Sequence, residues 1–226
     1  RGKRAIEDHF DISYELEHQI KGTNKEHYLT EIRSVITKCT FSYTRQIEMK
    51  GLGHAILCGE TLIGDQPFAV LLADDLCDAP TNGVLSQMVE LYKKYHCSIV
   101  AIEEVPKEET NKYGVIAGNE IEPGIYMIKD MVEKPEPEVA PSNLAIIGRY
   151  ILTPDIFDII KETKPGKGGE IQITDALLTQ AKKGMVLAYK FEGQRFDCGS
   201  VDGYVKATNY FYDKSTKKEK KEAGKK

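Results

Sequence analysis

The chain has 226 residues, of which 41% are hydrophobic and 29% charged, and it contains 19 glycines. This composition is typical of a globular protein with a sizeable core, and it excludes the collagen-like, low-complexity and disulfide-scaffold classes. No apolar run approaches the roughly 18–20 residues that a membrane span needs. The charged residues Arg1–Arg4 are not followed by the apolar stretch of a signal peptide. We therefore expect a cytoplasmic protein that does not contact a membrane.

The formal net charge of −4 is unevenly distributed along the chain. The segment Lys214–Lys226 holds seven Lys and two Glu and so contributes +5, which leaves −9 on the other residues. An acidic body argues against a nucleic-acid-binding protein. We expect residues 214–226 to form a basic, disordered tail, the solvated and frayed end of a helix, rather than a contact for an anionic partner. Residues 1–213 are then expected to form one domain.

The five cysteines are odd in number and widely spaced, and they form no Cys-x-x-Cys pair. This usage is typical of reduced, unpaired cysteines in a cytoplasmic protein and does not favour a catalytic thiol.

Hydrophobic spacing predicts the elements of the first part of the chain. The expected elements are helices over Arg4–Lys21, Lys25–Lys38 and Gly51–Ile63, and strands over Phe41–Gln46 and Phe68–Ala73. The last of these is a short, continuous apolar run, which predicts a fully buried strand of a parallel sheet.

Strands and helices then alternate through the rest of the chain. The expected strands are Cys97–Glu103, Tyr113–Ile116, Ile125–Glu133, Leu144–Leu152 and Val186–Phe191. The expected helices are Leu85–Tyr95, one starting at Thr153-Pro154, Thr174–Lys183 and Asp202–Asp213. The alternation predicts an α/β fold with a Rossmann-like, mixed but mainly parallel sheet flanked by helices. Between residues 113 and 152 no long helix separates the strands, which predicts a smaller, partly antiparallel subregion.

Two carboxylates are candidates for a metal site. Asp74 and Asp75 follow an apolar strand, and ligands of open α/β sheets bind at the carboxyl ends of strands. Asp74 can hold a hard cation such as Mg²⁺, which prefers carboxylate oxygen. Asp197 follows a later strand and supplies the second carboxylate that such a site needs. The alternative for each residue is a structural role in a turn.

Two further motifs have the chemistry of ligand contacts. Gln46 precedes Gly51-Leu52-Gly53 at a helix start, where glycines let a backbone approach a flat ligand and a Gln can read a nucleobase edge. At Glu133-Lys134 a carboxylate can bind sugar hydroxyls while the lysine neutralises a phosphate. The alternatives are an ordinary loop entering a helix and an ordinary charged strand end.

These motifs occur together and in a specific order. The ordered set is Gln46 with Gly51-Leu52-Gly53-His54-Ala55, Leu72-Ala73-Asp74-Asp75, Tyr113-Gly114-Val115, Val132-Glu133-Lys134-Pro135, Ser142–Tyr150, Gly169–Asp175 and Asp197-Cys198-Gly199. In this order the chain resembles the bacterial UTP–glucose-1-phosphate uridylyltransferases, within the sugar-phosphate nucleotidyltransferase family. The resemblance covers the whole chain apart from the tail.

The resemblance implies a Mg²⁺-dependent nucleotidyl transfer from UTP to glucose 1-phosphate, which gives UDP-glucose and pyrophosphate, and a homo-oligomeric enzyme. It implies that Gln46 and Gly51 read uracil, that Gly114 and Glu133 contact glucose with Asn143 nearby, that Lys134 holds the sugar phosphate, and that Asp74 and Asp197 hold the metal. The segment Gly169–Asp175 is interpreted only as a loop that enters a helix.

One part of the family pattern does not occur in these residues. Members of the family begin with a strand and a Gly-x-Gly-Thr-Arg loop that wraps the nucleoside triphosphate. The first strand–helix–strand portion is therefore expected to be missing upstream of Arg1, leaving an exposed sheet edge. We expect the chain alone to be poorly stable and poorly active, which unfolding beside an extended chain tests.

Three alternatives remain open. The first is a thymidylyltransferase that uses dTTP, because uracil and thymine share the edge that Gln46 would read. The second is an inactive fragment that binds UDP-glucose or UTP without turnover. The third, a nicotinamide-dependent enzyme, is disfavoured because no Gly-x-Gly-x-x-Gly follows a strand.

Overall fold

The structure is a computed structural model that describes residues 4–223, without the side chains of residues 31, 32, 167 and 218–223. The chain forms two compact units, Arg1–Ile47 and Glu48–Lys226, which are described separately. The sequence predicted one domain over 1–213, and the contact pattern differs from that prediction by dividing it after Ile47.

The described part of the first unit is helical. Its helices are α1 (Arg4–His9), α2 (Tyr14–Ile20) and α3 (Glu26–Ile36). Arg33 of α3 forms an ion pair with Glu17 of α2, and the rings of Phe10 and Phe41 stack with centroids 4.6 Å apart. The strand predicted over Phe41–Gln46 does not form, because this segment has no strand partner to satisfy its backbone.

A six-stranded sheet forms the centre of the second unit. Its strands are β1 (Phe68–Leu71), β3 (Ser98–Glu104), β4 (Gly114–Glu122), β5 (Ile125–Glu133), β6 (Leu144–Leu152) and β7 (Val186–Lys190), in the order β1-β6-β3-β7-β5-β4. The mixed α/β prediction is confirmed, but the sheet is not mainly parallel. Among the described strands only β3 and β7 pair in parallel. The other strand pairings are antiparallel, including those of β6 with its main neighbours β1 and β3.

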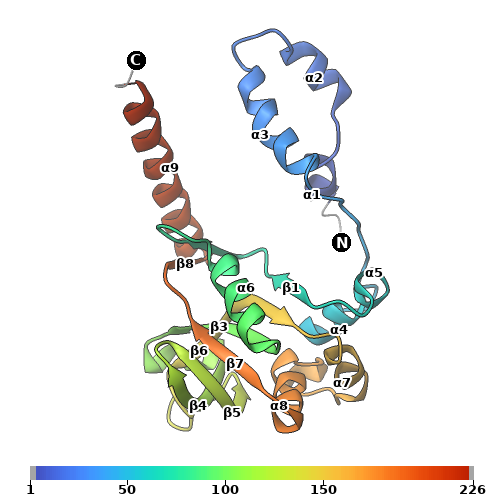
Figure 1. Ribbon diagram of the computed structural model, residues 1–226, viewed down its shortest axis with the longest axis vertical. Coiled ribbons are helices and arrows are strands. Elements are labelled where there is room, and N and C mark those ends of the chain that lie inside the picture. The colour runs from blue at the N-terminus through green and yellow to red at the C-terminus, as the bar shows by residue number, and fades with distance from the viewer. Residues whose placement is uncertain (1–3, 224–226) are drawn as a thin grey trace. The chain divides into compact units, whose positions relative to one another are not determined.

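Helices cover both faces of this sheet (Figure 1). They are α4 (Gly51–Leu57), α5 (Glu60–Ile63), α6 (Val84–Tyr95), α7 (Ile156–Glu162) and α8 (Ile173–Lys183), with 3-10 turns at Lys107–Lys112 and Lys167–Gly169. Successive side chains of β3 alternate between the faces, as strand geometry requires. Val100 and Ile102 pack with α4, α7 and α8, whereas Ile99 and Ala101 pack with α6. The two apolar layers hold the sheet between them.

Strand β1 lies at the edge of the sheet and pairs only with β6 among the described strands. Phe68 stacks on Phe157 of α7 with ring centroids 5.0 Å apart, whereas 52% of Leu71 is exposed. The prediction of a fully buried strand here is therefore wrong: the continuous apolar run alternates between a packed face and an open face.

A two-stranded ribbon carries the chain from the sheet to the C-terminal helix. It pairs β2 (Asp75–Asp78) with β8 (Gln194–Asp197), and α9 (Val201–Ala223) follows. Tyr210 and Lys214 of α9 bind the Asp78 carboxylate, Tyr210 at 2.7 Å, and these bonds lower the pKa of Asp78. Helix α9 extends over residues 214–223, where the sequence predicted a disordered tail. Residues 224–226 lie outside the described part.

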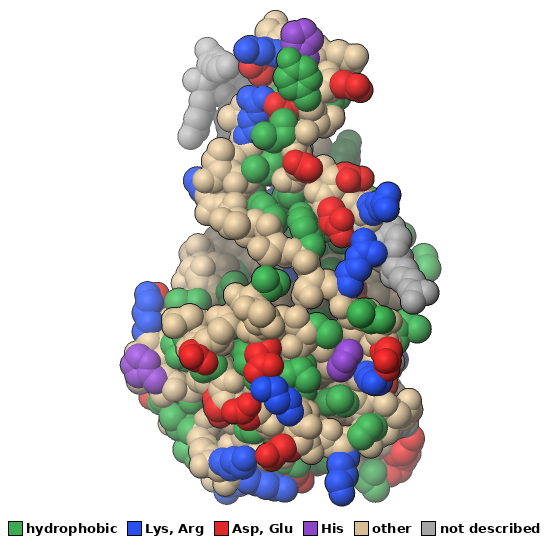
Figure 2. Space-filling view, turned by 90° about the vertical axis from the view of Figure 1, so that its right-hand side faces the viewer, with side chains coloured by type: hydrophobic (Ala, Val, Ile, Leu, Met, Phe, Trp, Pro, Cys, Tyr) green, Lys and Arg blue, Asp and Glu red, His purple; other side chains and the backbone are tan. Residues whose placement is uncertain are grey.

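The surface carries interspersed charges of both signs on the face drawn in Figure 2. One exposed pair joins Lys161 of α7 to Glu60 of α5 at 2.6 Å. Within residues 4–223, no helix is long and apolar enough to cross a bilayer.

Candidate active site

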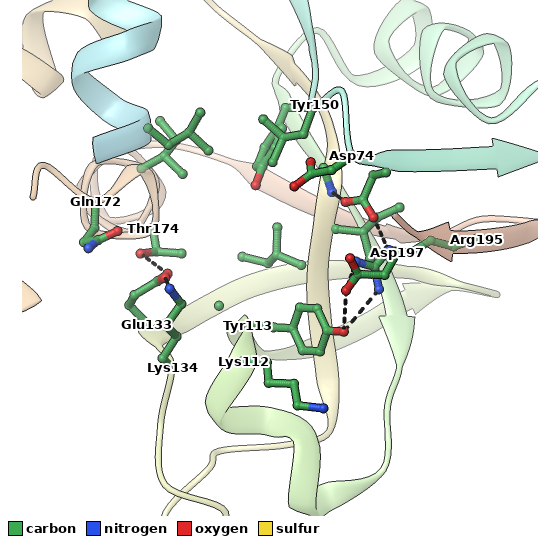
Figure 3. A pocket seen from close by; sticks show the side chains of 18 of the residues that line it. Asp74, Lys112, Tyr113, Glu133, Lys134, Tyr150, Gln172, Thr174, Arg195 and Asp197 are labelled. Atoms are coloured by element: carbon green, nitrogen blue, oxygen red, sulfur yellow. Dashed lines mark hydrogen bonds and ion pairs between the residues drawn. The ribbon is translucent and has the colours of Figure 1, made fainter. Parts of the chain in front are cut away.

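A pocket of about 350 Å³ opens in the second unit, where the ends of β5 and β8 and the middle of β6 meet the turn after β1 and the start of α8. Figure 3 shows two groups of polar side chains facing each other across it. Asp74 and Asp197 lie on one side, and Glu133 and Lys134 lie on the other, with Tyr113 between them. Gly114 also lines the pocket, so the fold brings together predicted site residues from four separate motifs.

The two adjacent aspartates at residues 74 and 75 have different surroundings. Asp75 is buried, and its Oδ2 accepts a hydrogen bond from the Gly148 amide at 2.6 Å while its Oδ1 binds the Arg195 guanidinium. Asp74 is exposed, and no hydrogen bond to its carboxylate is found within the described residues. Asp75 therefore has the structural role, and Asp74 keeps its carboxylate available for a ligand.

Asp74 and Asp197 approach each other at Gly199. A Cβ placed on Gly199 would lie 3.1 Å from Oδ1 of Asp197 and 3.4 Å from Oδ2 of Asp74. A glycine is thus what leaves space between the two carboxylates. Oxygen-only ligands around a small open space suit a hard cation such as Mg²⁺, which retains several waters. The described residues contain no group of three or more His, Cys, Asp and Glu side chains that could hold a metal, so the protein would supply only two carboxylates.

Arg195 is the cation at the base of this acidic cluster. Its side chain is 8% exposed and contacts Asp75, Glu103 at 3.6 Å and Asp197 at 3.4 Å. Arg195 and the neighbouring Arg149, which donates to the Asp75 carbonyl, together cannot balance these three carboxylates and Asp74, so the cluster stays net negative. Burial raises the pKa of Glu103, which is the direction expected where negative charge is costly. The charge balance fits an added divalent cation.

Glu133, on the opposite side of the pocket, is held by a threonine at the start of α8. Thr174 Oγ1 donates to Glu133 Oε2 at 2.9 Å, and Thr174 itself is 3% exposed. A Cβ on Gly114 would lie 2.6 Å from Thr174 Cγ2 and 3.2 Å from that carboxylate oxygen. Gly114 is therefore required for close packing around Glu133, and it lines the pocket together with Glu133.

Lys134 has an unusual backbone conformation. Its φ is 47°, in the left-handed region that residues other than glycine rarely adopt, and its amide donates to the Tyr113 carbonyl at 2.9 Å. Its ammonium lies 3.9 Å from Glu133 Oε1 and remains partly exposed. Such conformations cost of order 1–3 kcal/mol and concentrate at functional sites, which favours a ligand-binding role for this lysine.

Gly51, Leu52 and Gly53 form the first turn of α4, which packs against the chain at residues 170–171. The Gly53 amide donates to the Ile171 carbonyl at 2.9 Å, and the Ile171 amide donates to the Lys50 carbonyl at 2.8 Å. A Cβ on Gly53 would lie 2.7 Å from the same Ile171 oxygen. The two glycines are thus needed for the packing of α4 against residues 170–171, independently of any ligand. Leu52 lines the pocket, whereas Gly51 does not.

Besides Gly51, two predicted site residues are not placed in the pocket. Asn143 is exposed and is absent from the lining, and its backbone carbonyl accepts from the Val105 amide at 3.0 Å. Gln46 belongs to the first unit and is described only within it.

Sequence reasoning missed several polar side chains of the pocket: Tyr113, Tyr150, Gln172, Thr174 and Arg195. Tyr113 and Thr174 belong to the family-like motifs Tyr113-Gly114-Val115 and Gly169–Asp175, so the sequence does contain a signal that could have identified them. Tyr150 is buried, and that burial raises the pKa of its phenol. Arg195 is two residues before Asp197, and only the pairing of β2 with β8 places it beside Asp75.

Comparison with known families and proteins gives consistent results. The nucleotidyl transferase family matches residues 10–214 of the chain. A UTP–glucose-1-phosphate uridylyltransferase of Pseudomonas aeruginosa is 70% identical over 214 residues, which are 94% of this chain and 77% of the relative. The Bacillus subtilis protein of the same name is 46% identical over 211 residues, which are 93% of this chain and 72% of that protein.

Solved structures agree with these relatives. A crystal structure of apo UDP-glucose pyrophosphorylase, 66% identical, superposes with a TM-score of 0.91 over 95% of this chain and 79% of that one. A UDP-glucose pyrophosphorylase complexed with UDP-glucose, 63% identical, superposes with a TM-score of 0.88 over 95% and 78% of the two chains.

Proposed function

We propose that this chain, which belongs to the nucleotidyl transferase family and within it to the UTP–glucose-1-phosphate uridylyltransferases, transfers the uridylyl group of UTP to glucose 1-phosphate. A phosphate oxygen of the sugar attacks the α-phosphorus of UTP in line. The bond from that phosphorus to the oxygen bridging to the β-phosphate breaks, and pyrophosphate leaves. The observation that carries the proposal is the pocket itself, where the carboxylates of Asp74 and Asp197 face Glu133 and Lys134.

Binding and orientation account for the role of the protein in this reaction. The second pKa of a phosphate is near 6, so the attacking phosphate is largely ionised at pH 7 and needs no general base. Lys134 neutralises and aligns that phosphate from its constrained backbone position. Glu133, held by Thr174, accepts hydrogen bonds from glucose hydroxyls, and Gly114 leaves space beside it.

Asp74 and Asp197 are the residues that would hold Mg²⁺. When bound, the cation supplies charge stabilisation to the phosphoryl oxygens. Asp74 is oriented by its turn, since the amide of Cys198 donates to its carbonyl at 2.7 Å and Arg149 donates to the carbonyls of Leu72 and Asp75.

The base-reading and outer sugar contacts are assigned by the family resemblance. Gln46 and the backbone at Gly51 are proposed to read uracil, and Asn143 is proposed to lie near the sugar. A dTTP-using enzyme is the second candidate for this chemistry, and parallel turnover of UTP and dTTP distinguishes the two.

Release of pyrophosphate from UTP and glucose 1-phosphate with Mg²⁺ tests the reaction. We expect release that stops when EDTA removes the cation, and that is retained in the exposed-surface control Asp158→Asn. Binding of UDP-glucose without any turnover would identify the chain as a binding protein instead. The absence of both UDP-glucose binding and turnover would overturn the proposal.

We also propose a homo-oligomer and a cytoplasmic location. Apolar side chains of α9 are exposed at Val201, Tyr204, Val205 and Tyr212, which supports association, and light scattering measures it. The five cysteines are all unpaired, which supports a reducing compartment.

A further inference from the structure

We infer that Tyr113 is a positioning residue whose hydroxyl, together with Arg195, fixes the orientation of the Asp197 carboxylate toward Asp74. The inference rests on the proposed function, because that function assigns Asp197 to the cation. The sequence motif Tyr113-Gly114-Val115 assigns a role to Gly114 only.

The direction of the hydrogen bonds follows from which groups can donate. Tyr113 Oη lies 3.2 Å from Asp197 Oδ2 and 3.4 Å from Arg195 Nη1. A guanidinium has donors only, so the phenol oxygen accepts from Arg195 and its single proton points to Asp197. The Arg195 guanidinium also lies over the Tyr113 ring, 5.1 Å from its centroid, so that the ring keeps this arrangement in place. Figure 3 shows these three side chains together at the pocket wall.

The two oxygens of Asp197 are thereby held differently. Oδ2 receives Tyr113 and lies 3.4 Å from Arg195 Nη2, whereas Oδ1 accepts from the Gly199 amide at 3.0 Å. Oδ1 is also the oxygen nearest the space at Gly199 that Asp74 shares. Without the phenol, Oδ2 keeps only the longer contact to Arg195, and the carboxylate gains freedom to rotate away from that space.

The remaining contacts of Tyr113 make it possible to test its hydroxyl alone. Its carbonyl accepts from the Lys134 amide at 2.9 Å, and a change of side chain leaves that backbone bond intact. Replacing Tyr113 with Phe therefore perturbs the carboxylate side of the pocket and not the Glu133–Lys134 side. Tyr189 offers a matched control, because its half-buried hydroxyl donates to Gln87 at 3.0 Å and it does not line the pocket.

The experiment measures Mn²⁺ binding, by the electron paramagnetic resonance signal of free Mn²⁺, in the presence of UDP-glucose. Loss of a hydrogen bond to a charged group predicts about tenfold weaker Mn²⁺ binding by Tyr113→Phe, with the UDP-glucose affinity and melting temperature unchanged. Tyr189→Phe is expected to bind Mn²⁺ like the unsubstituted chain. Arg195→Lys, which keeps the charge but loses the planar fork, is expected to weaken Mn²⁺ binding as well.

Unchanged Mn²⁺ binding by Tyr113→Phe would overturn the inference and leave the proposed function standing. If Tyr113→Phe lowers the Mn²⁺ affinity, the UDP-glucose affinity and the melting temperature together, the inference is also overturned, because the hydroxyl would then be merely structural. Failure of the unsubstituted chain both to bind Mn²⁺ with UDP-glucose and to turn over UTP would instead remove the proposed function and the inference together.

Discussion

Asp74 and Asp75 are chemically identical neighbours that the fold uses for different purposes. The Asp75 carboxylate accepts hydrogen bonds from Arg195 and the Gly148 amide, whereas Asp74 faces the pocket without such bonds in the described part of the chain. A sequence pattern of two consecutive carboxylates cannot separate these roles. The separation follows from strand pairing, which sets Asp75 opposite Asp197 in the ribbon.

The two aspartates should therefore respond differently to the same substitution. Asp74→Asn is expected to lower kcat/KM by at least about 100-fold, the effect of losing a metal ligand, with little change in stability. Asp75→Asn is expected to destabilise the fold by about 3 kcal/mol, because the buried Arg195 loses its closest carboxylate. Urea unfolding and initial rates measure the two effects. Equal destabilisation by both substitutions would contradict the assignment.

Lys134 combines a proposed function with backbone strain, and two substitutions separate these properties. Lys134→Ala and Lys134→Gly should both lower kcat/KM by about 10²–10³-fold, because each removes the ammonium that neutralises the phosphate. Only the glycine variant should raise the melting temperature, since glycine adopts a φ of 47° without strain. Lys129→Ala, at an exposed position of β5, the strand that Lys134 follows, serves as the control. Full activity of both Lys134 variants would show that the ammonium is not used.

Among the elements, the segment Glu170–Thr174 links the start of α4 to Glu133. Ile171 exchanges backbone hydrogen bonds with Lys50 and Gly53 at the start of α4, and Thr174 donates a hydrogen bond to Glu133. The sequence interpretation of this segment as a loop entering a helix described its shape correctly but missed what it connects. The contacts come from residues more than 40 positions away, which no local pattern reveals.

The close approach at Gly53 gives a prediction for this element. A Cβ at Gly53 would lie 2.7 Å from the Ile171 carbonyl, so Gly53→Ala should destabilise the second unit by about 1–3 kcal/mol. The control Gly83→Ala meets nothing closer than 3.9 Å and has an ordinary φ of −54°, so it should be nearly neutral. Urea midpoints of the two variants measure the difference. An unchanged urea midpoint for Gly53→Ala would contradict the prediction, because the start of α4 would then accommodate the added methyl group without a loss of stability.

At the scale of the whole molecule, the two units differ in how much apolar surface they bury. In the described part of the first unit Leu29 is the one buried hydrophobic residue, whereas most residues of β3, β6 and β7 in the second unit are buried. Burial of apolar area is the main stabilising contribution in folded domains. The second unit therefore contains the stable core.

Native-state hydrogen exchange should reveal this difference. We expect the amides of α1, α2 and α3 to exchange through openings that cost little free energy, and those of β3, β6 and β7 to approach the global unfolding free energy. The measurement is exchange with mass-spectrometric readout across a denaturant series. Equal protection of both units would show that they unfold as one.

Sequence patterns predicted the α/β class, most of the helices and strands of the second unit, and the motifs whose residues Asp74, Gly114, Glu133, Lys134 and Asp197 line one pocket. Periodicity and residue chemistry are local properties, so they can be read from neighbouring residues.

Only the three-dimensional fold reveals the antiparallel pairings of β6, the β2–β8 ribbon, the difference between Asp74 and Asp75, and the contacts of Tyr113, Thr174 and Arg195. Each of these depends on a partner distant in the sequence. A hydrogen bond or ion pair between such residues exists only after the sheet has ordered its strands, which is why no pattern in one segment predicts it.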